Sequence, residues 1–369
     1  MQFECLVENI KNAVNIVEKI TGKNTTIPIL NSFYIESLSK NINISTTNLE
    51  LGIQTPINGI VKKTGVVVVP SKVFSSFISS LPIRERVIVT SEGNNIVLET
   101  EKHRTVIKGF DVDEFPPFPV IEEIYNIQIT KTHLLDALRR SIIAASYFNT
   151  KQELSSVFIS RNNELTFAST DSFRLAEERI EKKYFEASKN NFSFLVPVRT
   201  IDELVRLLEL DKSGVVAFNV SGNGIVVSTE LFTLFSRLIE GKFPEYKDIV
   251  PVRFKTTAVA KKHDLADHIK QARVFSGKLN ELKLTVDPEG LICFTAQDNN
   301  IGEHQSNIKA KVTGEKTILS VNWKYLLDGV SGFKEGEIYM GFNDPLDPIL
   351  LKPNTQGSFF HIIMPMRGV

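Results

Sequence analysis

The sequence predicts an α+β protein built from three tandem domains, because short motifs recur along it at a nearly fixed spacing. The first motif reads Thr-Asn-Leu-Glu at residues 47–50, Thr-Asp-Ser-Phe-Arg-Leu at 170–175 and Gln-Asp-Asn-Asn-Ile at 297–301, each time after a strand-like alternation. Two further motifs, Val-Pro before a predicted helix and Phe-Pro between thirds, recur at offsets of 127 and 128 residues. A repeat as long as a small domain indicates domain repetition rather than a solenoid.

The length supports this division. A chain of 369 residues is too long for one ordinary core and fits three domains of about 120 residues each. Proline-bearing connectors at 115–125 and 244–255 give domain bounds of 1–122, 126–249 and 253–369. Within each third, a strand, a helix and a run of strands occur twice in succession, which predicts helices on one side of antiparallel sheets.

Apolar residues at helical spacing predict two amphipathic helices in each third. In chain order, the six apolar stripes are Ile10, Val14 and Val17; Val73, Phe74, Phe77 and Leu81; Leu134, Leu138 and Ile142; Ile201, Leu204, Val205 and Leu208; Leu265, Ile269 and Ala272; and Leu326, Val330 and Phe333. The segments between them alternate apolar and polar residues and end in Gly- or Asn-rich turns, which predicts short strands.

Each predicted helix also carries Lys or Arg on the side away from its apolar stripe, and the second places Ser75, Ser76 and Ser79 there. The basic residues are Lys11, Lys19, Lys72, Arg139, Arg140, Arg199, Arg206, Lys270 and Lys324. For any one helix, a solvated face is the ordinary explanation. Recurrence on all six indicates one mildly basic, helix-lined surface that would touch phosphates through long side chains.

The overall charge is balanced, with 43 basic and 43 acidic residues. Proteins that hold DNA by neutralising phosphates are usually basic, so any DNA contact must be local or must not depend on affinity. No apolar run approaches the ~20 residues of a membrane helix, and the first residues lack a signal-peptide pattern. Cys5 and Cys293 lie in strand patterns of different thirds, so we expect core cysteines and a cytoplasmic protein.

Motifs of known enzyme classes are missing from the sequence, including phosphate-binding loops, metal-binding His-Glu-x-x-His and nucleophile elbows. His263 and His268 are five residues apart, a spacing that does not stack them on one helix face. The Asp pairs at 111 and 113 and at 344 and 347 are framed by prolines and are typical of turns. We therefore expect no catalytic residue, no metal and no cofactor, and a binding protein rather than an enzyme.

Six segments in order across the three repeats resemble the bacterial sliding clamps, the beta subunits of DNA polymerase III. They are Ile-Pro-Ile-Leu at 27–30, Thr-Asn-Leu-Glu at 47–50, Val-Pro-Ser-Lys at 69–72, Thr-Asp-Ser-Phe-Arg-Leu at 170–175, Gly-Lys-Phe-Pro-Glu-Tyr at 241–246 and Met-Pro-Met-Arg at 364–367. The resemblance covers the whole chain and implies three internally duplicated DNA-clamp domains, with helices lining a ring and antiparallel sheets outside.

The resemblance also implies a function without catalysis. Two chains would close head to tail around duplex DNA, tether the DNA polymerase III alpha subunit, and be opened by an ATP-driven clamp loader. Other clamp-motif proteins of replication and repair would bind the same site, and no membrane is involved. The alternatives are a sequence-specific DNA binder, which would concentrate base-reading side chains on one element, a repeat enzyme, and a non-clamp DNA-binding scaffold of the same fold.

Three sets of site residues follow from the resemblance. A peptide-binding pocket would comprise Leu154, Thr170, Ser172, Phe173, Arg174, Leu175, Pro244, Ile249, Ile362, Met364, Pro365, Met366 and Arg367. The DNA-facing set adds Lys23 and Lys151, on loops, to the nine basic helix residues. The dimer interface would comprise Val73, Thr105 and Ile107 of one copy and Val274 and Phe275 of the other.

Three residues depart from the family pattern: Thr105 at the dimer interface, where a large apolar residue is common, and Phe173 and Asp248 at the pocket, where His and a basic residue can occur. Leu154, Leu175 and Ile362 have an alternative explanation as plain core residues. Met364 and Met366 lie near the chain end, where Met side chains suit a pocket that adapts to several peptides.

Overall fold

The computed structural model describes residues 1–21, 27–118, 125–334 and 336–367, and Lys23 of the predicted DNA-facing set lies outside them. Its six longer helices are α1 (Val7–Val17), α2 (Ser71–Ser80), α3 (Lys131–Ser141), α4 (Val198–Leu210), α5 (Lys262–Ala272) and α6 (Trp323–Ser331). No helix in this described part of the chain is long and apolar enough to cross a membrane.

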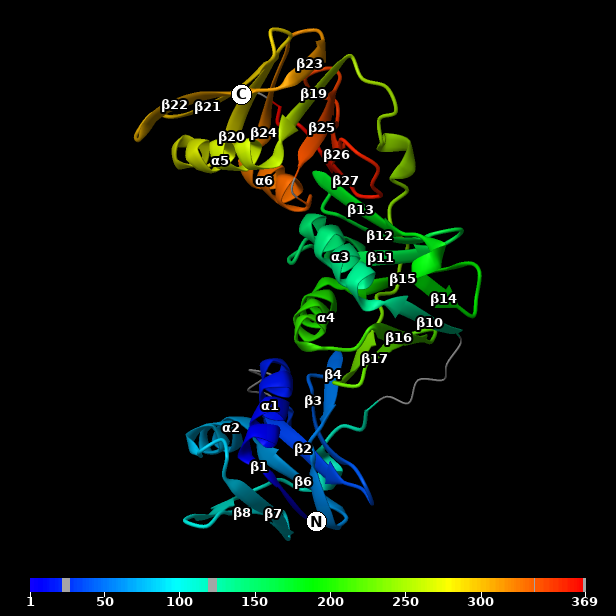
Figure 1. Cartoon of the computed structure of the whole chain (residues 1–369), viewed down its shortest axis with the longest axis vertical. Helices are drawn as coiled ribbons and strands as arrows, with labels where there is room; N and C mark the ends of the chain where they lie inside the picture. Colours follow the sequence, from blue (N-terminus) through cyan, green and yellow to red (C-terminus); the bar gives the residue numbers. More distant parts are fainter. Residues whose placement is uncertain (22–26, 119–124, 335, 368–369) are drawn as a thin grey trace. The chain divides into compact units, whose positions relative to one another are not determined.

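The strands fall into three sets in chain order (Figure 1). The first is β1 (Gln2–Leu6), β2 (Ser32–Ser37), β3 (Ile42–Thr47), β4 (Leu51–Pro56), β5 (Gly59–Lys63), β6 (Gly65–Pro70), β7 (Arg86–Glu92), β8 (Asn95–Glu99) and β9 (Arg104–Ile107). The second is β10 (Tyr125–Thr130), β11 (Ser156–Arg161), β12 (Leu165–Thr170), β13 (Arg174–Ile180), β14 (Phe185–Ala187), β15 (Phe192–Pro197), β16 (Val215–Val220), β17 (Gly224–Ser228) and β18 (Thr233–Arg237). The third is β19 (Thr256–Lys261), β20 (Glu281–Asp287), β21 (Leu291–Asp298), β22 (Gly302–Lys309), β23 (Lys311–Gly314), β24 (Thr317–Asn322), β25 (Glu337–Phe342), β26 (Ile349–Pro353) and β27 (Phe360–Ile363).

These sets repeat one another, with each helix beginning directly after a strand. The first N–H of α1, α3 and α5 makes the same backbone hydrogen bond in all three. Val7 donates to the carbonyl of Glu85, Lys131 to that of Gly214, and Lys262 to that of Gly336, each at 2.9 Å. The fold is therefore a threefold repeat of one α+β pattern, as the sequence predicts.

The chain divides into two compact units, and each is described by itself. The first comprises Met1–Lys131 and Arg206–Leu238. One of its antiparallel sheets has the strand order β5-β1-β7-β8-β9, and the other contains the run β10-β16-β17-β18-β4-β3-β2-β6. In that second sheet, β18 of the second repeat pairs with β4 of the first, with Leu234 opposite Ile53.

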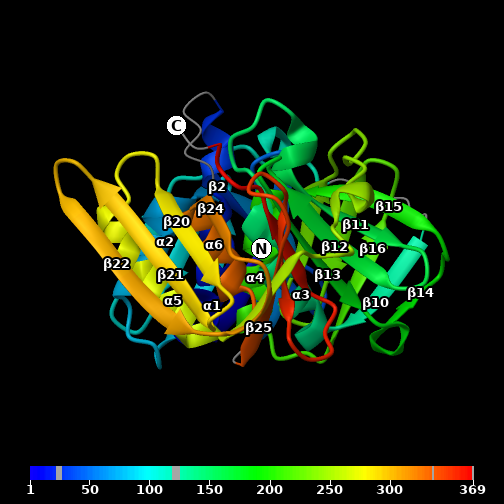
Figure 2. The same cartoon turned by 90° about the horizontal axis from the view of Figure 1, so that it is seen from above.

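The second unit comprises Thr132–Val205 and Ile239–Val369. Its sheets have the strand orders β15-β11-β12-β13-β27-β26-β25-β19-β23 and β22-β21-β20-β24. Here β27 of the third repeat pairs with β13 of the second, with Ile362 opposite Leu175. Helix α5 packs on β21 and β22, and α6 packs beside α5 (Figure 2). The sheets run across the sequence-predicted domain bounds, which remain predictions.

The cores are apolar and follow most of the predicted stripes. Phe3, Phe33 and Phe74 are fully buried in the first unit, as are Phe294 and Phe342 in the second. A large cluster in the second unit contains the stripes of both its last helices, from Leu265 to Phe333.

The stripe predicted for the second helix is wrong in register. Val73 is 53% exposed, while Ser75, which the sequence placed on the outer face, is buried. The buried face of α2 contains Phe74 and Ile78, one turn apart, and Leu81 extends it past the helix end. Four apolar residues in one short helix allowed two stripes, and the sequence pattern alone did not distinguish them.

Candidate functional site

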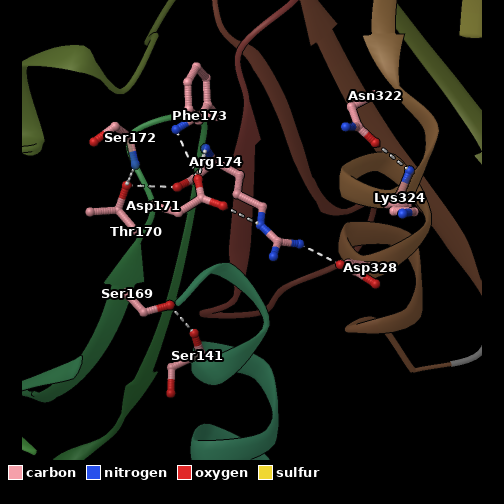
Figure 3. Close-up of polar contacts among 10 residues, drawn as sticks. All are labelled: Ser141, Ser169, Thr170, Asp171, Ser172, Phe173, Arg174, Asn322, Lys324 and Asp328. Atoms are coloured by element: carbon pink, nitrogen blue, oxygen red, sulfur yellow. Dashed lines mark hydrogen bonds and ion pairs between the residues drawn. The ribbon is translucent and has the colours of Figure 1, made fainter. Parts of the chain in front are cut away.

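The segment at residues 170–174 folds into a tight turn held by its own polar side chains (Figure 3). The Thr170 hydroxyl donates to the Arg174 carbonyl at 2.7 Å and accepts from the Ser172 N–H at 3.1 Å. The Asp171 carboxylate accepts from the N–H groups of Phe173 and Arg174 at 2.9 and 3.0 Å. Ser172 has a φ of +77°, and Phe173 at the tip is 60% exposed.

The segment at 47–51 makes the same turn in the first repeat. The Thr47 hydroxyl donates to the Leu51 carbonyl and accepts from the Leu49 N–H, both at 3.1 Å. Asn48 Oδ1 accepts from Glu50 and Leu51, and Leu49 has a φ of +76°. In the third repeat, Asp298 accepts from the Asn300 N–H at 2.8 Å in the same way. The recurring motif is thus a recurring turn.

The two threonines give a prediction for stability. Replacing Thr170 with Val keeps the side-chain shape but removes two hydrogen bonds, which should cost roughly 1–2 kcal/mol in unfolding free energy. Thr47→Val should cost about the same because its bonds are the same, whereas the exposed Thr150→Val should cost little. Urea unfolding at fixed protein concentration measures all three. If Thr47→Val left the unfolding free energy unchanged, this result would contradict the equivalence of the two turns.

Arg174 is held from three sides, although the sequence suggested it as a polar contact for a peptide. Its Nε donates to Asp171 at 3.0 Å, and a terminal nitrogen forms an ion pair with Asp328 of α6. Its guanidinium lies over the Tyr325 ring, 4.5 Å from the centroid. With 13% of its side chain exposed, Arg174 joins the turn to α6 rather than pointing outward.

The C-terminal segment is anchored to this turn by its backbone. The Met364 N–H donates to the Phe173 carbonyl, and the Met366 N–H donates to the Ser320 carbonyl of β24, both at 2.8 Å. The same two bonds occur one repeat earlier, from Arg237 to Glu50 and from Ile239 to Leu195, each at 2.9 Å. The last strand of each later repeat is therefore fixed to the turn of the repeat before it.

The structure brings much of the predicted pocket set together. Leu175 and Ile362 pair across β13 and β27 and share an apolar cluster with Phe243 and Tyr246. The buried members of the set are Leu154, Thr170, Leu175 and Ile362, the half-buried ones are Arg174, Met364, Pro365 and Met366, and the exposed ones are Ser172, Phe173, Pro244, Ile249 and Arg367. Phe173 and Ile249 are thus exposed apolar side chains on segments whose neighbouring residues, Leu175 and Tyr246, belong to a buried apolar cluster.

A fully buried histidine lies behind the Arg174 contacts. His361, on β27, lies opposite Ala176 of β13 and beside Gly329 of α6. Burial, and to a lesser extent the Arg174 cation, lower the pKa of its imidazole from 6.5 to about 3, and a backbone contact at Tyr325 opposes this shift only in part. His361 is therefore neutral at ordinary pH.

Most of the predicted DNA-facing residues are exposed on the helices or beside them. Those exposed are Lys19, Lys72, Arg139, Lys151, Arg199, Lys270 and Lys324, while Lys11 and Arg206 are half-buried. Lys11 donates to the Ser79 carbonyl at 3.2 Å, and Arg206 donates to that of Ile16 at 2.6 Å.

Arg140 has a different environment from the rest of the predicted DNA-facing set. It forms an ion pair at 2.5 Å with the buried Glu178, is 18% exposed and lies over the Phe359 ring. Because its charge is already held inside the second unit, we leave it out of the DNA-facing set.

The predicted interface residues differ in exposure. Val73 and Val274 are 53% and 58% exposed, whereas Ile107 is 5% exposed and belongs to the core of its own sheet. Thr105 and Phe275 are half-buried. Thr105 and Ile107 lie on β9, the last strand of its sheet. Val274 and Phe275 precede the sheet that ends in β22, and Phe275 stacks on His304 of that strand.

Sequence reasoning missed Tyr325, Asp328 and Glu177, which hold the turn and its strand in place. Asp328 lies 154 residues from Arg174, so no local spacing signals their contact. Within the described residues, no group of three or more His, Cys, Asp or Glu side chains is placed to hold a metal ion.

The repeated strand order, the helices and the joined sheets define a three-domain clamp fold. Family models for the DNA polymerase III beta subunit match in order: the N-terminal domain at residues 1–119, the central domain at 128–245 and the C-terminal domain at 247–367. The chain belongs to the DNA polymerase III beta subunit family.

Individual relatives agree along their whole length. The beta sliding clamp of Synechocystis sp. is 25% identical, and that of Bacillus subtilis 24%, each aligned over 100% of both chains. Solved structures of the Pseudomonas aeruginosa DNA polymerase III subunit beta and the Bacillus subtilis sliding clamp superpose with a TM-score of 0.93, at 20% and 24% identity, and also cover 100% of both chains. These matches do not favour a non-clamp scaffold.

Proposed function

We propose that two copies of this chain close head to tail into a ring around duplex DNA and tether the replicative polymerase there without catalysing a reaction. A closed ring stays on DNA because of its topology, so it needs no strong grip on phosphates. This agrees with a net charge of zero, which is unusual for a protein that holds DNA by electrostatic affinity.

The observation that carries this proposal is the pair of sheets left unjoined within one chain. The four-stranded run that ends in β4 is joined to β18, and the run that ends in β13 is joined to β27. The equivalent run of the third repeat ends in β22, and the equivalent closing strand of the first repeat is β9. In the described residues, each of these two strands lies at the end of its sheet. A second copy can supply the missing partner to each.

The internal repeat also gives the register of this pairing. Leu51 lies opposite Ser236, and its equivalent Arg174 lies opposite Ile363. The equivalent of Ser236 and Ile363 in the first repeat is Ile107, because Phe110 bonds to Val68 as Ile239 bonds to Leu195. In β22, Gly302 holds the position of Leu51 and Arg174, because Gln297 pairs with Glu303 as Thr47 pairs with Gly52 and Thr170 with Leu175, in a hairpin one residue longer. The proposed pairs between copies are Ile107 with Gly302, Val106 with Glu303, Thr105 with His304 and Arg104 with Gln305.

Exposure along these positions supports the same pairing. Leu51 is 8% exposed, and the Arg174 side chain is 13% exposed, each beside the strand of the next repeat. In the third repeat, the turn residue Ile301 lies directly before Gly302, which holds the equivalent position, and Ile301 is 61% exposed. An isoleucine that loses this exposure on pairing contributes favourably to association.

The DNA-facing residues should act together rather than singly. Replacing Lys72, Arg199, Lys270 and Lys324 together with Ala should lower loading onto DNA at least fivefold at low salt and less at high salt, because exposed charges are screened. Each single substitution should change loading less than twofold. As a matched control, four exposed lysines outside the six longer helices, at 62, 182, 283 and 352, are replaced together. Loss of loading from one substitution in an intact dimer would refute diffuse contact.

The second part of the proposal is a docking site for extended peptides at the 170–175 turn. Its occupants would be the DNA polymerase III alpha subunit, the clamp loader and other clamp-motif proteins. Phe173, Ile249 and Met364 would offer apolar surface to Leu and Phe side chains of the peptide. The large exposed Phe173 favours more hydrophobic peptides, and Asp248 gives the rim an acidic group.

Removal of the C-terminal segment tests this docking site. A chain that ends at Ile363 loses the backbone bonds of Met364 and Met366 and both Met side chains. It should bind a fluorescein-labelled Gln-Leu-Ser-Leu-Phe peptide at least tenfold more weakly while remaining a dimer. The matched variant Met364→Ala/Met366→Ala keeps the backbone hydrogen bonds and removes only the side chains. Its peptide affinity therefore gives the side-chain contribution to binding. Equal peptide affinity of the truncated and full chains would remove the segment from the site.

A further inference from the structure

Strand β13 carries a buried carboxylate that the proposed docking does not use directly. Glu177 is 1% exposed. Its Oε1 accepts from Arg179 Nε at 2.6 Å, and its Oε2 accepts a short hydrogen bond from the Tyr246 hydroxyl. A buried carboxylate is costly unless it is paired and hydrogen-bonded, so these two donors explain why the charge is tolerated at this position.

Tyr246 belongs to the segment that follows the Phe-Pro motif. Its ring packs edge-on against Phe243, 5.7 Å between centroids, and Phe243 stacks on Phe158 of β11 at 4.9 Å. Its carbonyl accepts from the Ile249 N–H at 3.1 Å. Pro244 and Ile249 are both exposed. They lie on either side of Tyr246 in the sequence, and the Tyr246 hydroxyl is hydrogen-bonded to Glu177 of β13.

The same strand begins at the docking turn. Arg174 and Leu175 are its first residues, and Glu177 follows within the same pairing with β27. One wall of the proposed peptide site is thus the start of β13, and the other is the 244–249 segment. The Tyr246–Glu177 hydrogen bond links these two walls directly.

We propose that Tyr246 and Glu177 are positioning residues, which hold the 244–249 segment against β13 so that Pro244 and Ile249 present a preformed apolar wall to the peptide. The inference rests on the proposed docking function. A site ordered before binding avoids the entropy cost of ordering a loop on binding. The phenol ring alone would pack in the apolar cluster, so the hydroxyl is the group that fixes the segment to the strand.

The test uses the full-length protein and the same labelled Gln-Leu-Ser-Leu-Phe peptide. Tyr246→Phe retains the ring and removes the link, and it should weaken peptide binding at least fivefold. Glu177→Gln keeps a hydrogen-bonding partner for the Tyr246 hydroxyl but loses the charge that Arg179 contacts. It should therefore lower the thermal unfolding midpoint and leave peptide affinity within twofold of wild type.

Ser358→Ala is the matched control. The Ser358 hydroxyl donates to Glu178, the next residue on β13, which is also buried and forms an ion pair with Arg140 of α3. Like Tyr246→Phe, Ser358→Ala removes a hydrogen bond from a hydroxyl to a buried carboxylate of β13. It leaves the 244–249 segment unchanged, so peptide affinity should not change.

The outcomes separate the two proposals. Unchanged affinity in Tyr246→Phe, with binding by the wild type, would overturn the positioning role and leave the docking site standing. Affinities that fall in step with the thermal midpoint across all three variants would reduce the role to general stability and overturn it as well. A wild type that does not bind the peptide would overturn both proposals.

Discussion

Replacing Ile301 with Arg is expected to convert the proposed dimer into a monomer. Ile301 is 61% exposed in the single chain, and the proposed register places it directly beside the pair that Gly302 would form with Ile107 of a second copy. The substitution removes the burial of an apolar side chain, worth about 1.5–3 kcal/mol, and forces a charge into the pairing edge. Together these effects should raise the dimer dissociation constant at least a hundredfold, which corresponds to about 3 kcal/mol. Light scattering across a dilution series measures it.

The matched control is Ile318→Arg. Ile318 lies on β24, at the opposite end of the same four-stranded sheet from β22, and is 45% exposed. The proposed register gives it no place in the interface, so the dimer should persist. If both variants dimerise like the wild type, the β9–β22 pairing is wrong; if both dissociate, the effect is not specific to that edge.

Acid is expected to destabilise the protein through His361. Its pKa in the folded state is lowered to about 3 from the ordinary 6.5. As the pH falls through 6.5, the unfolded chain binds a proton that the folded chain rejects, so stability is complete above pH 6.5 and declines toward pH 3. At pH 5 this proton linkage should cost about 2 kcal/mol of unfolding free energy.

Comparison with His361→Leu isolates this cost. Urea unfolding at pH 7.5 and pH 5, at one protein concentration, should show a loss for the wild type that is about 2 kcal/mol greater than the loss for the variant. His103 is exposed, so the His103→Leu variant should lose as much unfolding free energy between pH 7.5 and pH 5 as the wild type. An equal pH dependence of wild type and His361→Leu would mean that His361 does not set the acid sensitivity.

The repeat, the succession of strands and helices along the chain, and the helices themselves could be predicted from the sequence because they depend on local patterns. The motif at residues 47–50 and 170–175 predicted that one local structure recurs, and the turns at 47–51 and 170–174 have matching hydrogen bonds. The buried stripe of the second helix was predicted wrongly because Val73, Phe74 and Phe77 fit two overlapping stripes. Which stripe is buried depends on packing of α2 against α1 and its sheet, and periodicity does not contain that information.

The polar supports of the candidate site could not be predicted in the same way. Asp328 contacts Arg174 across 154 residues, and Tyr246 contacts Glu177 across 69 residues. Arg140 looked like another outward-facing cation, yet Glu178 holds it. Such contacts depend on how sheets join between repeats, which no spacing within one repeat specifies.

Retention on DNA tests the central claim of topological binding most directly. The protein is loaded onto nicked circular DNA by an ATP-driven clamp loader, isolated with the DNA by gel filtration, and followed after the circle is cut once. The account predicts that it stays on the intact circle through a high-salt wash and is lost once the DNA has ends. Equal retention on circular and linear DNA would contradict the account, because it would show binding by affinity rather than by enclosure.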